Sequence, residues 1–400
     1  MKKIFLISAV LYLLAFMSCK EDTLGPLSKD KVSPGKVSVV NVTSLNGGVE
    51  VEYKLPADND LLYVKAVYDL VGGVKGEVKA STFENKLQIL GFGDTLQRTV
   101  NLYAVDRSGN LSEPAAVNVK PLIPSVRLIQ ESLKIRADFG GAKFTWENKT
   151  TAPISIEMFA EDSITHKLKK VNTVYTSQAA SSYNLRNMKS VPTNFAAVIR
   201  DRWDNVSDTI RPIAKITPLF EQTLDKSKMR KVILSSDTNW DAWGCRFENV
   251  FNNDFGDAVH TQGDHLMPQI MTIDLGVKVK LSRFRLYQRI GPGYVYFYTH
   301  GNPYRYDVYG AEEMPADPND LSQWKKLRPE CVSTKPSGWG QLTDEDIQHG
   351  LNGDEYEFDQ INNPTEIRYF RLVVKETWDG ANFVDFTELS WWGSVSKVYN

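Results

Sequence analysis

The chain has 400 residues, and its 47 Lys and Arg residues against 49 Asp and Glu residues give a formal net charge of -2 at pH 7. This balance provides no basic surface of the kind that nucleic-acid binding needs. The 18 Pro, 26 Gly, 18 Phe, 17 Tyr and 9 Trp residues favour many short strands and turns over helices. The length is sufficient for roughly two to four domains.

The first 18 residues have the pattern of a signal peptide. Two lysines precede an apolar run from Ile4 to Met17, which is shorter than the roughly 20 apolar residues of a membrane-spanning helix. A cysteine after a small residue at the expected cleavage position resembles the bacterial lipobox, which implies that Cys19 is lipidated. An ordinary signal peptide with an incidental cysteine is the alternative.

The residues after this cysteine also suggest a location. Lys20-Glu21-Asp22 resembles the export tag of surface-displayed lipoproteins in Gram-negative glycan degraders. The resemblance implies a protein anchored by lipid to the outer membrane and facing the cell exterior. Residues 19–33 form the lipidated N-terminus and a polar tether containing Gly25 and Pro26.

Residues 34–121 alternate between apolar and polar side chains. Val49, Val51 and Tyr53, for example, fall on one face of a predicted strand. About seven such strands in about 90 residues predict an immunoglobulin-like sandwich. The arrangement resembles fibronectin type III modules.

An internal repeat predicts a second sandwich over residues 122–217. Gly47-Gly48 has an echo in Gly140-Gly141, and the Asp106–Asn110 turn has one in Asp201–Asn205. Nearly equal offsets are typical of tandem domains. Prolines near both ends of the second repeat favour a semi-rigid stalk. We interpret both domains as spacers, with scaffolding for a partner as the alternative, because neither concentrates the residue types of a catalytic site.

Residues 218–400 contain further strands of period two. Met271, Ile273 and Leu275 alternate with polar residues, and Phe284 and Leu286 fall on one face of the next predicted strand. The order of the segments Phe251–Thr261, Met271–Gly276, RFRLY, YDVYG and ELSWWG resembles the coagulation factor V/VIII type C, or discoidin-like (galactose-binding-like), family over about residues 225–393. The resemblance implies an antiparallel jelly-roll sandwich that binds carbohydrate. The predicted fold class is therefore all-β, with two immunoglobulin/fibronectin III-like sandwiches followed by this domain.

A cluster of acids and histidines raises the question of a metal. It comprises Asp254, Asp257, His260, Asp264 and His265, but no His-Glu-x-x-His spacing for zinc is present. The discoidin-like resemblance implies a structural calcium ion instead. Its expected ligands are Asp254 and Asp257 through their side chains, Asn252 through a carbonyl or amide oxygen, and Glu388 as the closing carboxylate. An ordinary hydrogen-bonded loop is the alternative.

Two other features are an acidic segment at residues 344–359 and a pair of cysteines. Residues 344–359 look superficially like a calcium loop, but His349 stands where an EF-hand needs glycine, so we predict a solvated acidic loop. Cys245 and Cys331 are either a disulfide or two buried free thiols.

Aromatic residues in loops carry the functional prediction. Flat aromatic surfaces beside amide, Arg and carboxylate groups suit the apolar C–H faces and hydroxyls of sugars. The predicted carbohydrate-binding residues are Trp240, Trp243, Arg289, Tyr294, Tyr296, His300, Asn302, Trp339 and Trp378. Burial under a neighbouring loop is the alternative for each aromatic residue, and one of Trp391 and Trp392 is expected in the core.

Together these features predict a surface lipoprotein that binds a polysaccharide or oligosaccharide for a polysaccharide-utilisation system, with a glycan-import transporter complex as a further partner. We expect no enzymatic activity. A glycoside hydrolase is the first alternative, since a pair of carboxylates across a cleft would be invisible in the sequence. A surface adhesin or assembly subunit that binds protein is the second.

Overall fold

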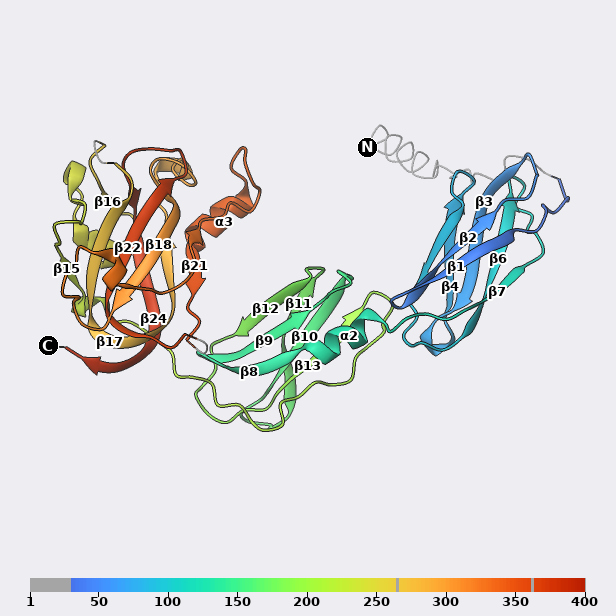
Figure 1. Cartoon of the computed structure of the whole chain (residues 1–400), viewed down its shortest axis with the longest axis horizontal. Coiled ribbons are helices and arrows are strands. Elements are labelled where there is room, and N and C mark those ends of the chain that lie inside the picture. Colours follow the sequence, from blue (N-terminus) through green and yellow to red (C-terminus); the bar gives the residue numbers. More distant parts are fainter. Residues whose placement is uncertain (1–29, 264–265, 361–362, 400) are drawn as a thin grey trace, which may run out of the picture.

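The computed structural model describes residues 30–263, 266–360 and 363–399. Three β-sandwiches follow one another along the chain (Figure 1), and each has its own hydrophobic core. The predicted all-β fold class is therefore confirmed. The predicted signal peptide, Cys19 and the Lys20-Glu21-Asp22 segment lie outside the described residues. Within the described ranges, no helix is both long enough and apolar enough to span a membrane.

The first sandwich is fibronectin III-like, with sheets of three and four strands. One sheet has the order β1-β2-β5 and the other β4-β3-β6-β7, with all neighbours antiparallel. Val49, Val51 and Tyr53 all point into the core between the sheets, as their alternation predicts. The elements are β1 (Ser38–Leu45), β2 (Gly48–Lys54), β3 (Leu61–Asp69), the 3-10 turn η1 (Val71–Gly73), β4 (Lys75–Ser81), β5 (Lys86–Leu90), β6 (Arg98–Asp106) and β7 (Ala115–Val119).

The second sandwich has two sheets of three strands, ordered β8-β9-β12 and β11-β10-β13. A short helix, α2 (Ser125–Ser132), precedes it and buries Val126 and Ile129 against the core. The strands are β8 (Lys134–Asp138), β9 (Gly141–Glu147), β10 (Ile154–Glu161), β11 (Leu168–Thr176), β12 (Ala180–Leu185) and β13 (Phe195–Asp201).

The internal repeat corresponds to the same turn built twice. Asp106 Oδ1 accepts hydrogen bonds from the backbone N–H groups two and four residues further on, and Asp201 Oδ1 does the same. The side chains of Asn110 and Asn205 each donate to the other carboxylate oxygen, at 2.9 and 2.8 Å. This equivalence confirms the repeat, because the residues match in role as well as in spacing.

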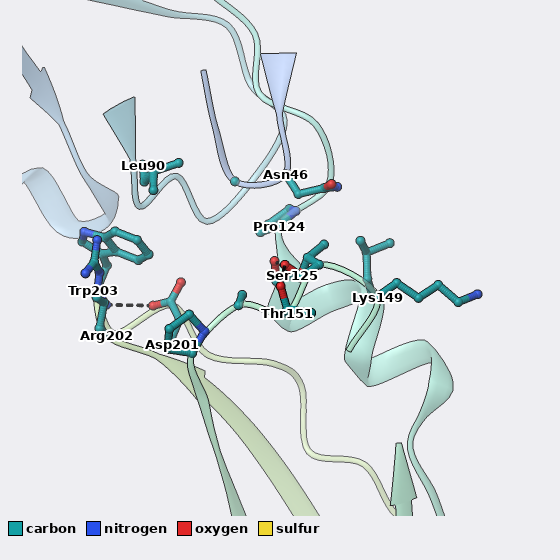
Figure 2. A pocket seen from close by; sticks show the side chains of 14 residues that line it. Asn46, Leu90, Pro124, Ser125, Lys149, Thr151, Asp201, Arg202 and Trp203 are labelled. Atoms are coloured by element: carbon teal, nitrogen blue, oxygen red, sulfur yellow. Dashed lines mark hydrogen bonds between the residues drawn. The ribbon is translucent and has the colours of Figure 1, made fainter. Parts of the chain in front are cut away.

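The two N-terminal sandwiches meet at a cavity of about 600 Å³, shown in Figure 2. Trp203, from the repeated turn of the second sandwich, lies against Gly91 of the first, where a Cβ atom would come within 2.8 Å of the indole. Asn205 Nδ2 donates to the Gly91 carbonyl at 3.0 Å. The Arg202 guanidinium lies 4.2 Å from the centre of the Trp203 ring. These contacts support a firm joint between the first and second sandwiches.

A second joint connects the middle and C-terminal sandwiches through charged side chains. Arg186 of the middle sandwich donates to Glu357 at 2.5 Å and to Glu221 at 3.0 Å. Arg283 pairs with the same Glu221 at 3.2 Å. Arg186 of the middle sandwich thus forms ion pairs both with Glu221, just before β14, and with Glu357 of strand β21.

The C-terminal domain is built around the 19-residue strand β17 (Gln269–Tyr287), which belongs to both layers of the jelly roll. Its first part pairs with β22 (Glu366–Thr377) and its second part with β24 (Glu388–Val398). The bend between them falls near Gly276, whose φ of 68° suits glycine and whose Cβ would lie 2.3 Å from the Lys228 carbonyl oxygen.

The period-two alternation of this domain is confirmed. Met271, Ile273, Leu275, Phe284 and Leu286 are all fully buried. The remaining elements are β14 (Gln222–Thr223), η2 (Lys226–Lys228), β15 (Arg230–Val232), η3 (Ala242–Gly244), η4 (Phe247–Phe251), β16 (Val259–His260), η5 (Pro292–Tyr294), β18 (Pro303–Ala311), η6 (Leu321–Gln323), β19 (Lys325–Lys326), β20 (Cys331–Val332), α3 (Asp344–Asn352), β21 (Asp354–Glu357) and β23 (Asp385–Phe386).

The prediction of a solvated acidic loop at residues 344–359 is wrong. Asp344–Asn352 forms helix α3 and Asp354–Glu357 forms strand β21. The helix begins with a capping box, in which Thr343 and Asp346 exchange hydrogen bonds between side chain and backbone. Burial would raise the pKa of Asp346, but hydrogen bonds from Ser337 and Thr343 outweigh it and hold that pKa well below its usual range.

The two cysteines are free thiols. Cys245 is partly exposed, whereas Cys331 is buried, and burial raises the pKa of the Cys331 thiol to about 12. Of the two tryptophans in the closing strand, Trp391 is buried in the core. Trp392 lies under Arg283, whose guanidinium is 4.0 Å from the ring centre.

Candidate functional site

The loop between β17 and β18 is held by Asn302. This fully buried side chain accepts from the Arg289 backbone N–H at 2.7 Å and donates to the backbone oxygens of Arg289 and Tyr296, at 3.2 and 2.7 Å. Its backbone oxygen accepts from the Trp378 N–H at 3.0 Å. The prediction that Asn302 contacts sugar is therefore corrected: its side chain braces the loop.

A buried carboxylate organises the side chains of this loop. Asp385 is fully buried in β23, and its Oδ2 accepts from Arg289 Nη1 at 2.7 Å and faces His300 Nδ1 at 2.8 Å. His260 Nε2 lies 3.5 Å from the same oxygen. Burial raises the pKa of Asp385, while the hydrogen bonds from Arg289 and His300 act in the opposite direction. Asp385 thus holds Arg289 and His300 by hydrogen bonds, and His260 lies beside them.

Aromatic rings surround these polar groups. Tyr296 stacks on His300 with ring centres 3.9 Å apart, and the Arg289 guanidinium is 5.2 Å from the Tyr296 ring centre. Phe383 stacks on His260 at 4.9 Å. Trp243 is 75% exposed and meets the edge of His260 at 6.5 Å. We call this group the arginine–histidine site; its members are Trp243, His260, Arg289, Tyr296, His300, Phe383 and Asp385.

A second group of aromatic rings lies beyond the same loop. Trp339 is 80% exposed, and its ring centre is 5.6 Å from that of Trp378 and 6.4 Å from that of Tyr304. Trp378 and Tyr304 are 4.7 Å apart. We call these three residues the tryptophan surface. The structure therefore places two of the predicted carbohydrate-binding residues, Trp243 and Trp339, in two separate groups.

Trp240 belongs to neither group, and its predicted role in sugar binding is wrong. The side chain is 0% exposed, donates through Nε1 to the Ile270 carbonyl at 2.9 Å, and packs edge-on against Phe386 at 5.7 Å. It is a core residue of the C-terminal domain. Tyr294, by contrast, is exposed and stacks on Phe297 with ring centres 6.0 Å apart, so it lies at the margin of the loop.

The residues expected to bind calcium do not fit the ion. Glu388 is fully buried, and its Oε1 accepts from Lys226 Nζ at 2.7 Å while its Oε2 accepts from the Asn253 N–H at 2.9 Å. A protein cation therefore already neutralises the carboxylate that was expected to close the site. Asp254 and Asp257 are exposed.

The loop oxygens are engaged with the loop itself. Asn252 Oδ1 accepts from the Asp254 N–H at 2.6 Å, Asn252 Nδ2 donates to Asp257 at 3.3 Å, and Asp254 Oδ1 accepts from the Gly256 N–H at 2.9 Å. This is the geometry of the hydrogen-bonded loop that the sequence left as the alternative. The other members of the acid and histidine cluster do not complete a metal site in the described residues. His260 is turned towards Asp385, and Asp264 and His265 lie outside the described residues.

Three members of the arginine–histidine site were not predicted as sugar-binding residues. Asp385 and Phe383 stand in the segment before the closing strand, and His260 was considered only as a metal ligand. Antiparallel pairing of β16 with β23 brings His260 opposite Asp385. That pairing joins segments more than 120 residues apart, so no local sequence pattern could have found it.

Three family models match successive parts of the chain, each described as a domain of unknown function. They are DUF4959 at residues 34–121, DUF5126 at residues 122–227 and DUF5000 at residues 247–393. Each model covers most or all of one of the three hydrophobic cores. A comparison with curated proteins found no match.

Solved structures similar to the chain include a SusE-like protein, at 29% identity and a TM-score of 0.44 over 68% of this chain and 100% of that one. A CBM32 module from a family 31 glycoside hydrolase of Clostridium perfringens has 18% identity and a TM-score of 0.31, over 43% of this chain and 95% of the module. A two-domain fibronectin type III segment of chicken tenascin has 15% identity and a TM-score of 0.22, over 46% of this chain and 99% of the segment.

Proposed function

We propose that this protein binds glycans through the arginine–histidine site and does not cleave them. The observation that carries the proposal is the buried Asp385, which holds Arg289 at 2.7 Å and His300 at 2.8 Å beside the half-buried Tyr296 ring and the exposed Trp243 indole. Fixed polar groups next to a flat apolar surface are complementary to a sugar ring.

Each polar group has a defined part in this proposal. Because His300 Nδ1 faces the Asp385 carboxylate, Nδ1 is the ring nitrogen that donates there, and the Nε2 of the neutral imidazole is an acceptor for a sugar hydroxyl. Arg289 uses one Nη atom on Asp385, which leaves N–H donors for neighbouring hydroxyls. Trp243 offers its exposed indole to the C–H face of the ring. Such preorganisation reduces the entropy lost on binding.

Binding fits this site better than hydrolysis does. Glycoside hydrolysis generally needs two carboxyl groups on opposite sides of the scissile bond. Asp385 Oδ2 is occupied by Arg289 and the two histidines, and the carboxylate is buried beneath them. A binding role agrees with the names of similar solved structures, a SusE-like protein and carbohydrate-binding modules.

The remaining features suggest where the protein acts. Lipidation at Cys19 and the Lys20-Glu21-Asp22 tag would place it on the outer membrane facing outwards. The two N-terminal sandwiches would then hold the C-terminal domain away from the membrane, within a system that imports polysaccharide through a transporter complex.

The test is retardation of the full chain in native gels containing each of a panel of polysaccharides. Trp243→Ala should weaken retention by the roughly 30-fold that corresponds to a hot spot of about 2 kcal/mol, and His300→Ala should also weaken it. Tyr175→Ala is the matched control, because Tyr175 is as exposed as Trp243 but lies on the second sandwich. Unchanged retention in both site variants would contradict the proposal.

A further inference from the structure

We infer that the tryptophan surface is a second glycan subsite, so that the ligand is an extended chain of sugars and not a single terminal residue. This inference rests on the proposed function.

The first observation is the exposure of Trp339, which is 80% accessible and flanked by Gly338 (φ 75°) and Gly340 (φ 135°). Nothing lies within 4 Å of a Cβ built on either glycine, so both glycines face open space. A contiguous exposed apolar patch with a polar rim is a mark of an interaction site, and Trp339 forms such a patch with Trp378 and Tyr304.

The base of this loop is fixed. Lys335, whose side chain is only 7% exposed, donates to the backbone oxygens of Gly340 and Gln341 at 2.7 and 2.9 Å. Ser337 donates through its backbone N–H and its hydroxyl to the buried Asp346, at 2.9 and 2.7 Å. A braced base limits the movement of the exposed indole, which reduces the entropy lost when a ligand stacks on it.

The three rings of the surface meet at steep angles. Trp339 is inclined by 66° to both Trp378 and Tyr304, and those two rings are inclined by 49° to each other. Trp378 is itself fixed, because its Nε1 donates to Ser333 at 3.1 Å. The surface is therefore an apolar corner in which one ring can take the face of a sugar and another its edge.

Charged groups border this corner, which favours a sugar over a purely apolar occupant. The Arg305 guanidinium lies 5.4 Å from the Tyr304 ring centre and pairs with Glu330 at 3.1 Å and Glu376 at 3.5 Å. A positively charged hydrogen-bond donor and two negatively charged acceptors thus lie beside aromatic faces. Sugar rings need this combination, because they have both hydroxyl groups and apolar C–H faces.

The corner is continuous with the arginine–histidine site through one loop. Asn302 holds Arg289 with its side chain and Trp378 with its backbone oxygen. The neighbouring Gly301 N–H donates to Asp379 Oδ1 at 3.2 Å. The two sites share this frame but no ligand-facing side chain, so one sugar chain can contact both while each site can be removed separately.

Two linked contacts should raise the affinity for long ligands far more than for short ones. When one site is engaged, the second binds at a high effective concentration, which can increase overall affinity by about 10²- to 10⁴-fold. The experiment compares a monosaccharide, a series of oligosaccharides and the parent polysaccharide retained by the wild type, measured by calorimetry on the full chain.

Trp339→Ala should lower polysaccharide affinity by at least about tenfold while changing monosaccharide affinity by less than about twofold, and Trp339→Phe should restore most of the loss. His300→Ala should weaken both. Thermal melting of Trp339→Ala should match that of the wild type, because this side chain is 80% exposed. His300 is a partner of the buried Asp385, so the binding of His300→Ala is compared at a temperature well below its own melting temperature. Equal polysaccharide affinity in Trp339→Ala and wild type would overturn the inference. An equal loss for short and long ligands would overturn it in favour of one site. A wild type that binds none of the glycans would instead overturn the proposed function.

Discussion

Lys226 and Glu388 form a buried ion pair that offers a sharp test of how the C-terminal domain is held together. Their side chains are 6% and 0% exposed, and Lys226 Nζ lies 2.7 Å from Glu388 Oε1. Burial lowers the pKa of Lys226 and raises the pKa of Glu388 to about 7. The pair connects η2 at the start of the domain to β24 at its end, and the Asn253 N–H ties the 252–257 loop to the same carboxylate.

Replacing Lys226 by Met should leave the Glu388 carboxylate buried without a counter-charge. Removing one partner of a buried ion pair costs about 3 to 5 kcal/mol. Near the melting temperature of a domain of 150 to 250 residues, each kcal/mol corresponds to a shift of about 2 to 4 °C. We therefore expect the melting temperature of the C-terminal domain to fall by roughly 6 to 20 °C at pH 8.

The loss should depend on pH, and its sign follows from the raised pKa of Glu388. A carboxyl whose pKa is higher in the folded state than the ordinary 4.5 binds its proton more tightly when folded. Its contribution to stability is therefore present in full below about pH 4.5 and is lost as the pH rises through the folded pKa. Without Lys226 this folded pKa should rise further, so Lys226→Met should be less destabilising at pH 5 than at pH 8.

Differential scanning calorimetry of the full chain at the two pH values measures both effects. Lys228→Met is the matched control, because Lys228 belongs to the same 3-10 turn but is not the residue paired with Glu388. Adding Glu388→Gln to Lys226→Met should recover much of the stability, since no buried charge would remain. A cost below about 1 kcal/mol at pH 8, or the same cost at pH 5, would refute the reasoning.

Three further outcomes are expected. Chelation of divalent metal should leave the melting temperature of the C-terminal domain unchanged, whereas a fall together with calcium in elemental analysis would restore the predicted ion site. Trp240→Ala should cost roughly 3 to 5 kcal/mol of stability, measured by urea unfolding; Trp243→Ala should leave the unfolding curve nearly unchanged, and the interpretation fails if the two behave alike. Cys19→Ala should release the protein from membranes, and replacing Glu21 and Asp22 should leave it anchored but facing inwards; full protection of the wild type from protease on intact cells would contradict the surface location.

Local patterns in the sequence predicted the strands well, because the face on which a strand residue lies is set by its immediate neighbours. Met271, Ile273 and Leu275 occupy one face of β17 for the same reason that they alternate in the sequence. The same logic does not extend to loops. Trp240 and Trp243 stand three residues apart in one Asn- and Asp-rich segment, yet the first is in the core and the second at the surface. The difference depends on the Ile270 carbonyl and Phe386, which come from distant strands.

Only part of the candidate site could be predicted from the sequence, because the site also depends on contacts between distant segments. Arg289, Tyr296 and His300 were found because they stand in one loop whose composition suits sugars. The group that orients them, Asp385, lies 85 residues beyond His300 and had no local signal. An isolated acid among 49 Asp and Glu residues becomes recognisable only when strand pairing places it under two histidines and an arginine.

The calcium prediction illustrates what a resemblance between families can transfer. The positions of the loop and of the closing glutamate correspond to the expected pattern, and Glu388 does reach the 252–257 loop through the Asn253 N–H. The positive charge at that point comes from Lys226, which lies 162 residues earlier in the chain. A carboxylate that is buried needs a compensating charge, but either an ion or an ammonium group can supply it. The need therefore follows from the fold, whereas the group that meets it depends on a residue outside the shared pattern.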